Sequence, residues 1–198
     1  KGIFHIVHGM CEYIARYDHI FAFLAEKGYV CCGYDNLGHG ETAKSKDELG
    51  FIAHRNGWKY LVNDVKAFED AVKKMFPDKP LYLMGHSMGS FISRIAAENY
   101  GDGIEKFIIC GTGGPNAAAP SGLLLTDIMQ LFCGEKHRSR LINNIAFGAY
   151  NKRFEGESEY DWVTSDREVT AKYAADEYCT FKFTVSDMHD LVKLNQLT

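Results

Sequence analysis

Long apolar runs are missing from this sequence. No stretch approaches the roughly 18 residues that a membrane span needs, and the longest apolar runs have the length of single strands. Only four of the 198 residues are proline, and 46% are hydrophobic, so we expect a packed core and not a disordered chain. The length suits one globular domain, or one domain with a lid, and no transmembrane segment is predicted.

Basic residues are not in surplus either. Twenty-two Lys and Arg stand against twenty-six Asp and Glu, and the resulting net charge of −4 argues against a dedicated nucleic-acid binder. The six cysteines include no C-x-x-C pair, and their spacing predicts no metal site. Cys31, Cys32 and Cys110 lie inside apolar runs, where reduced thiols behave as small hydrophobes. Because the first residues form neither a basic leader nor a cleavage site, we expect a cytoplasmic location.

The first 111 residues alternate between apolar runs and segments of helical spacing. The runs are residues 3–7, 29–34, 81–84 and 107–110, and the helical segments are 17–27, 58–75 and 87–100. Continuous apolar strands separated by helices predict an α/β fold whose parallel sheet is covered on both faces. Asn56 is available to cap the second helix. The polar, glycine-rich segment 36–57 is predicted to be a long loop, a type of segment that often carries function.

The pattern changes after Gly111. A break rich in Gly, Ala and Pro over residues 113–120 precedes helical segments near 121–133, 139–150, 166–177 and 184–197. We therefore predict a partial core at 1–111 and a helical cap or lid at 112–198. The apolar residues of the first cap helix line an acyl tunnel or pack inside the cap, and spacing does not separate these alternatives. They are Leu123, Leu124, Leu125, Ile128, Leu131 and Phe132.

A catalytic motif lies between the third strand and its helix. Residues 85–89 read Gly-His-Ser-Met-Gly, the G-x-S-x-G pattern of a nucleophile elbow. Such an elbow holds the serine on a strained turn above the sheet, with glycines where strand and helix approach each other and a helix N-terminus behind the hydroxyl. We predict that Ser87 is a nucleophile, and the alternative is a serine that only caps the helix.

A serine nucleophile of this type also needs donors for the oxyanion that its attack creates. In this architecture one donor is the backbone N–H after the nucleophile, here that of Met88. The other comes from the loop after a strand, and His8-Gly9-Met10 follows the first apolar run. We therefore predict that the backbone N–H groups of Met10 and Met88 form the oxyanion hole.

These motifs together resemble the α/β-hydrolase superfamily, and within it the monoacylglycerol lipase and lysophospholipase branch with its serine-aminopeptidase-like relatives. The residues that carry the resemblance are His8-Gly9-Met10, Glu12, Arg16, Tyr17, Asp35-Asn36-Leu37-Gly38-His39-Gly40 and Gly85-His86-Ser87-Met88-Gly89. They match in order and separation from Ile3 to about Gly111, and the later residues resemble the family's helical cap in position and composition only. The resemblance implies an α/β-hydrolase fold with four strands present, no cofactor, and hydrolysis of lipid-type carboxylic esters such as lysophospholipids or monoglycerides.

The resemblance also implies roles for the other motif residues. His8 and His39 shape loops and are not bases, and Glu12 and Arg16 brace the oxyanion loop. Asp35 anchors the turn over residues 38–40. These are the structural roles that buried polar groups at strand ends usually have.

The sequence departs from the family in the rest of the catalytic triad. The acid and histidine should follow the serine, but only His137 and His189 do so, both in helical segments. Asp187 and His189 are two residues apart on one helix, so their side chains should point apart. We therefore expect the triad acid and histidine to lie outside these 198 residues, which would make the chain a fragment.

These departures have a structural consequence and leave other functions open. A fragment of this kind would expose sheet edges at 29–34 and 106–110, through which it would self-associate. Without its acid and histidine, the chain is alternatively a non-catalytic module that binds a lipid or a partner. An aminopeptidase or thioesterase on the same scaffold is a third interpretation. The expected partner is a lipid-like ester, with peripheral membrane contact through the cap and no nucleic acid.

Overall fold

A computed structural model describes residues 1–154 and 158–198, and its centre is a four-stranded sheet. The strands are β1 (Ile3–Val7), β2 (Val30–Gly33), β3 (Leu81–His86) and β4 (Ile104–Cys110). They pair in the order β2-β1-β3-β4, and every pair is parallel. The parallel sheet and its four strands are therefore as predicted, and β2 and β4 are its two edges.

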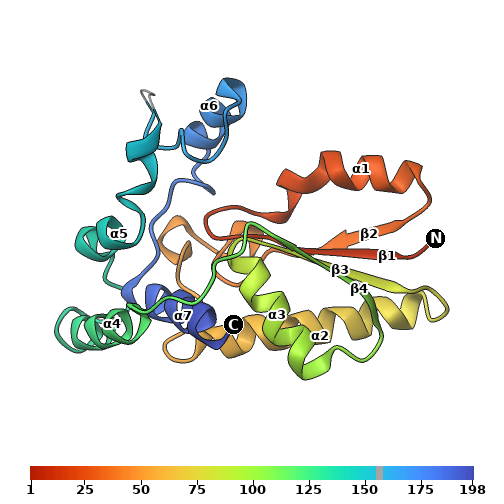
Figure 1. The fold of residues 1–198 in the computed structure, drawn as a ribbon, viewed down its shortest axis with the longest axis horizontal. Helices are drawn as coiled ribbons and strands as arrows, with labels where there is room; N and C mark the ends of the chain where they lie inside the picture. The colour runs from red at the N-terminus through yellow and green to blue at the C-terminus, as the bar shows by residue number, and fades with distance from the viewer. Residues whose placement is uncertain (155–157) are drawn as a thin grey trace.

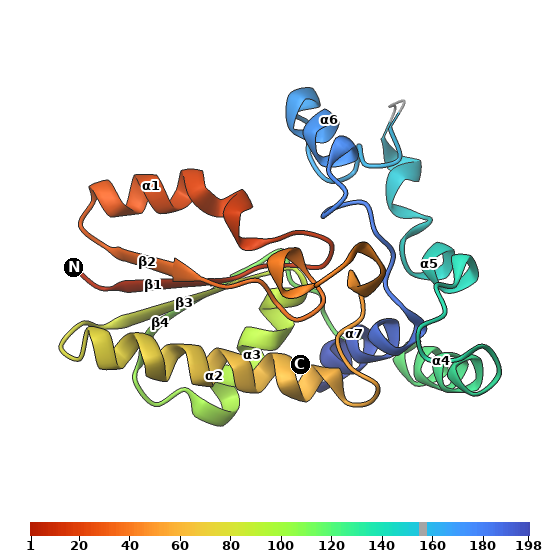
Figure 2. The same ribbon diagram turned by 180° about the vertical axis from the view of Figure 1, so that it is seen from behind.

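Helices cover both faces of this sheet. Helix α1 (Asp18–Glu26) lies on one face, whereas α2 (Gly57–Met75) and α3 (Met88–Tyr100) lie on the other (Figures 1 and 2). The helical spacing in α2 buries one stripe, which includes Leu61 and Val65, against β1, β3 and α3. Asn56 precedes α2 in a left-handed conformation, and its side chain makes no capping hydrogen bond.

The second half of the chain is helical in the residues that the structure describes. It contains α4 (Ala119–Cys133), α5 (Arg140–Phe147), α6 (Arg167–Ala175) and α7 (Val185–Leu197). Short 3-10 helices span Ile14–Tyr17, Gly40–Thr42, Lys46–Glu48 and Tyr150–Arg153. Helix α7 packs on α3 and α4, and its buried residues Met188 and Leu194 share one hydrophobic cluster with Met88 of α3. Helix α7 of the predicted cap thus packs on α3 of the predicted core, and the division between a core at 1–111 and a cap at 112–198 stays a prediction.

Strand β4 departs from the sequence expectation. Its apolar run predicted a strand buried on both faces, but Ile108 and Ile109 are 40% and 46% exposed, and Cys110 is exposed as well. The physical reason is that β4 is an edge strand, so neighbouring elements shield it less than they shield β1 and β3. Cys11 and Cys179, in loops, are the buried thiols instead, and all six cysteines are free.

Helix α4 also differs from what its spacing suggested. Leu125 packs against the main hydrophobic cluster. Leu124, Ile128, Leu131 and Phe132 are 46–80% exposed, so they neither line an enclosed tunnel nor pack in a core of the described residues. No helix within 1–154 and 158–198 is both long and apolar enough to cross a membrane.

Candidate active site

Ser87 lies on a strained turn between β3 and α3. Its backbone has φ 52° and ψ −120°, a region that residues other than glycine rarely occupy. Hydrogen bonds on both sides hold this conformation, because the Ser87 N–H donates to the Cys110 carbonyl at 2.9 Å and the Ser87 carbonyl accepts from the Ser90 N–H at 2.9 Å. The side chain is therefore presented at the carboxyl end of β3, at the start of α3.

The two glycines of the motif let strand and helix come together around this turn. A Cβ on Gly85 would lie 2.7 Å from the Ser93 hydroxyl oxygen and would collide with the Gly89 carbonyl. A Cβ on Gly89 would collide with the carbonyl oxygens of Val7 and His8 at the end of β1. The glycines therefore serve close packing, since neither has a positive φ.

The loop after β1 lies directly against Ser87. A Cβ on Gly9 would be 3.0 Å from the Ser87 Cβ, so this loop and the elbow are in contact. Within the described residues, the N–H groups of Met10 and Met88 donate to no protein acceptor. An oxyanion hole requires donors that are free to bind the developing charge, so the two N–H groups stay the predicted donors.

His8 is buried and shapes this loop. Its Nδ1 lies 2.8 Å from the Gly9 carbonyl oxygen, and its Nε2 accepts from the Asn36 N–H at 2.9 Å. The second bond places the imidazole proton on Nδ1, which donates to Gly9. Burial lowers the pKa of His8, so the ring stays neutral. Because a peptide unit is planar, fixing the Gly9 carbonyl also fixes the opposite direction of the Met10 N–H.

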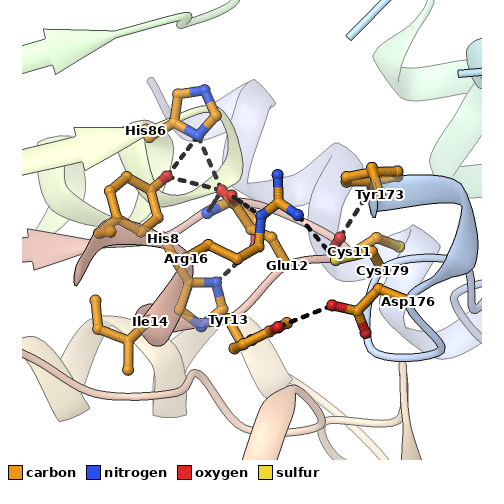
Figure 3. A network of polar contacts seen from close by, with 12 residues as sticks. His8, Cys11, Glu12, Tyr13, Ile14, Arg16, His86, Tyr173, Asp176 and Cys179 are labelled. Atoms are coloured by element: carbon orange, nitrogen blue, oxygen red, sulfur yellow. Dashed lines mark hydrogen bonds and ion pairs between the residues drawn. The ribbon is translucent and has the colours of Figure 1, made fainter. Parts of the chain in front are cut away.

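Glu12 joins the loop to the elbow (Figure 3). Its Oε1 accepts from the Gly9 N–H at 2.5 Å and from the Tyr17 hydroxyl at 2.9 Å, and lies 2.9 Å from Nδ1 of His86. Burial acts to raise the pKa of Glu12, but the hydrogen bond and charge of His86 and the Gly9 N–H outweigh it and lower the pKa. The carboxylate is therefore ionised at neutral pH, and Arg16 lies 3.7 Å from its other oxygen. These contacts match the bracing role that the resemblance implies.

The turn over residues 38–40 is built as the resemblance implies. Asp35 accepts from the Glu41 N–H and the Ile14 N–H, each at 2.8 Å, so it ties this turn to the chain before α1. His39 is buried, its Nδ1 donates to the Leu37 carbonyl at 2.9 Å, and burial lowers its pKa to about 3. Its ring is therefore neutral at neutral pH, and its bond to Leu37 fits the loop-shaping role that the resemblance implies.

Neither later histidine is hydrogen-bonded to Ser87 in the residues that the structure describes. His189 faces Asp127 at 3.4 Å and Asp190 at 3.9 Å, beside a surface cavity between α4 and α7 whose lining does not include Ser87. Asp187 points away from His189, accepts from the Ile52 N–H at 2.9 Å, and has its pKa raised to about 7 by burial. The expectation that these two side chains diverge is therefore correct.

Sequence reasoning missed the contacts that a distant segment makes with the oxyanion loop. The Tyr173 hydroxyl donates to the Cys11 carbonyl at 2.9 Å, and the Tyr13 hydroxyl donates to Asp176 at 2.8 Å (Figure 3). Over 160 residues separate the partners of each pair. No local pattern signals such a contact, so the sequence offered nothing that would have found it.

Comparison with known proteins decides the family. A model described as serine aminopeptidase, S33, matches residues 1–197. The chain belongs to the serine aminopeptidase S33 family. The resemblance predicted from its motifs is thereby confirmed, and so is the α/β-hydrolase fold.

Named relatives of this S33 chain include lipases and an esterase. It is 30% identical to the monoglyceride lipase of Mus musculus over 97 residues, which are 49% of this chain and 30% of that protein. It is 34% identical to the monoglyceride lipase homolog of Monkeypox virus over 100 residues, 49% of this chain and 33% of that protein. The crystal structure of a thermostable carboxyl esterase from Bacillus coagulans superposes with a TM-score of 0.84 at 25% identity, covering 100% of this chain and 64% of that one. The matches thus span about a third of the curated relatives.

Proposed function

We propose that this chain carries the nucleophile and oxyanion hole of a serine hydrolase that acts on lipid-type carboxylic esters, such as monoglycerides or lysophospholipids. The observation that carries the proposal is Ser87, strained at φ 52° between β3 and α3, with the Gly9 loop packed against it. The relatives named monoglyceride lipase and carboxyl esterase support the ester as substrate.

The chemistry follows from this placement. The Ser87 Oγ attacks the ester carbonyl carbon while its proton passes to a base, and the carbonyl oxygen becomes an oxyanion. The N–H groups of Met10 and Met88 stabilise that oxyanion, and each such donor contributes on the order of 10²–10³ in rate. The base then gives its proton to the leaving oxygen, so the intermediate expels the alcohol and leaves an acyl group on Ser87. Water attacks this acyl group, which releases the carboxylic acid and restores the Ser87 hydroxyl. The proposal assigns the nucleophile and the donors to this chain and assigns no residue as the base.

The exposed apolar residues of α4 and α5 support contact with a lipid surface. Leu131 and Phe132 of α4 are each 80% exposed, and Leu141 and Ile145 of α5 are 58% and 66% exposed. In soluble proteins, larger exposed apolar surfaces mark protein or membrane interaction sites. We therefore include peripheral membrane contact through this surface in the proposal, since a lipid ester is delivered from a membrane or micelle.

Covalent labelling tests the proposal. A fluorophosphonate probe reacts with a serine hydroxyl only when the site activates it. In a protein that carries the triad acid and histidine as well, we therefore expect adduct mass on Ser87, and none in its Ser87→Ala variant. Circular dichroism of both proteins controls for folding. An unlabelled Ser87 would overturn the proposal in favour of the non-catalytic binding module.

A substrate panel then separates the enzyme classes. In a protein that carries the triad acid and histidine as well, we expect hydrolysis of monoacylglycerol or lysophospholipid and at least a 10³-fold loss in Ser87→Ala, because the nucleophile is removed. Faster cleavage of aminoacyl amides or of thioesters than of these esters would assign the aminopeptidase or thioesterase interpretation instead.

A further inference from the structure

Cys11, directly after Met10, has an unusual backbone. Its φ is 53°, in the left-handed region that costs a residue with a side chain on the order of 1–3 kcal/mol, and that region is normally occupied by glycine. Such a conformation persists only where surrounding contacts impose it. The contacts that hold Cys11 therefore also control the loop in which the Met10 N–H lies.

Those contacts come from a segment more than 160 residues away, residues 173–181. The Tyr173 hydroxyl donates to the Cys11 carbonyl at 2.9 Å, and the Cys11 thiol donates to the Phe181 carbonyl at 3.3 Å. Cys11 and Tyr173 are 8% and 9% exposed, so water does not compete freely for these bonds. Among residues 1–154 and 158–198, both hydrogen bonds of Cys11 are thus made with segment 173–181.

Arg16 adds a second connection between the same two segments (Figure 3). Its guanidinium carbon lies 4.9 Å from the centre of the Tyr173 ring, and its Nη1 donates to Cys179 Sγ at 3.4 Å. Its Nε lies 3.7 Å from Glu12, whose other oxygen accepts from the Gly9 N–H. The residues on both sides of Met10 are therefore held, Gly9 through Glu12 and Cys11 through Tyr173.

We propose that Tyr173 is a positioning residue for the oxyanion hole: by holding Cys11 in its left-handed conformation, its hydroxyl keeps the Met10 N–H directed to the oxygen that develops charge. Tyr173 does not touch the reacting atoms. The inference rests on the proposed function. It adds that segment 173–181 completes the oxyanion hole, so that the reactivity of Ser87 depends on the contact between this segment and the loop over residues 9–12.

The test compares Tyr173→Phe with Tyr160→Phe in the full chain. Phenylalanine keeps the ring under Arg16 and removes only the hydroxyl bound to Cys11. Tyr160 is the matched control because its ring packs against that of Tyr173 with 5.2 Å between centroids, and in the part of the chain that the structure describes its hydroxyl makes no hydrogen bond to residues 9–12. Two readouts are measured, hydrogen exchange of the amides in residues 9–12 and the rate of fluorophosphonate labelling of Ser87.

The expected result is specific to Tyr173→Phe. Exchange in residues 9–12 should become faster, and labelling should slow about three- to tenfold, the effect of one buried hydrogen bond. With a soluble ester, kcat should fall by the same factor at unchanged KM, since the Met10 donor acts in the transition state. Tyr160→Phe should match the wild type in all these measurements.

Other results overturn the inference. Unchanged exchange in Tyr173→Phe would mean that the hydroxyl does not hold the loop. Faster exchange with unchanged labelling and kcat would mean that it holds the loop without positioning a donor. Failure of the proposed function is distinct, because wild-type Ser87 would then remain unlabelled while hydrogen exchange still reports whether Tyr173 holds Cys11.

Discussion

At the scale of single residues, the position of Ser87 depends on the close packing of the Gly89 backbone against the end of β1. A methyl group there would meet the carbonyl oxygens of Val7 and His8, which belong to backbone and cannot swing aside. Helix α3 would have to move away from β1, and Ser87 would move with it. By contrast, a Cβ on Gly114 would have no atom within 4 Å.

This contrast gives a prediction. Gly89→Ala should destabilise the protein by about 2 kcal/mol or more, since overpacking costs typically 1–3 kcal/mol, and should strongly reduce labelling of Ser87. Gly114→Ala, at an exposed position without a positive φ, should keep wild-type labelling. Urea midpoints and labelling rates measure both effects. Equal midpoints for the two variants would show that α3 is not packed on β1 as described.

At the scale of elements, α4 has two different faces. Leu125 and Met129 pack against the hydrophobic cluster, and Gly122 lies against Val192 of α7. On the other side, Leu124, Ile128 and Leu131 are exposed, and Phe132 is exposed at the C-terminal end of the helix. Spacing alone places apolar residues all around this helix, and only packing decides which of them are covered.

The exposed apolar side chains of α4, which include Leu131 and Phe132, are predicted to bind lipid vesicles. Replacing both Leu131 and Phe132 by Ser should weaken vesicle binding at least tenfold, because inserting each side chain is worth roughly 1.5–3 kcal/mol. Phe23→Ser on α1 is the control, since Phe23 is 59% exposed on a helix far from α4 (Figure 1). Vesicle co-sedimentation measures binding, and hydrolysis of a soluble ester should be unchanged in both variants. Equal loss in both variants would contradict a specific membrane surface.

At the scale of the whole molecule, the sheet has two edges, β2 and β4, that pair with no further strand in the residues that the structure describes. Strand β4 exposes Ile108 and Ile109 together with its free backbone groups, and a parallel sheet of this kind is usually shielded. The chain of 198 residues is therefore predicted to self-associate through β4 or β2.

Sedimentation velocity tests this prediction. Ile109→Lys should reduce the associated fraction several-fold, because a lysine on an edge strand opposes pairing with another edge. Met75→Lys, at a 71% exposed position at the end of α2, should leave association unchanged. A monomeric wild-type chain at micromolar concentration would refute the edge interaction.

Much of the fold and the position of the nucleophile followed from local patterns. Apolar runs of strand length and helical spacing depend only on neighbouring residues, so β1, β3 and α2 were predicted within a few residues. The G-x-S-x-G motif is also a local signal, because its five consecutive residues can be recognised in the sequence, although Gly89 packs on Val7 and His8 of a distant strand end. Family membership also followed from such motifs.

The tertiary structure decided what depends on which distant segments meet. Exposure of Ile109 and Phe132 was not predictable from their apolar character, because burial is a property of the neighbours that cover a residue and not of the residue itself. The bond from Tyr173 to Cys11 joins residues 162 positions apart, and chain spacing carries no information at that range. The sequence alone therefore determined which elements form and where the serine lies, whereas packing determined what remains exposed and what holds the loop beside it.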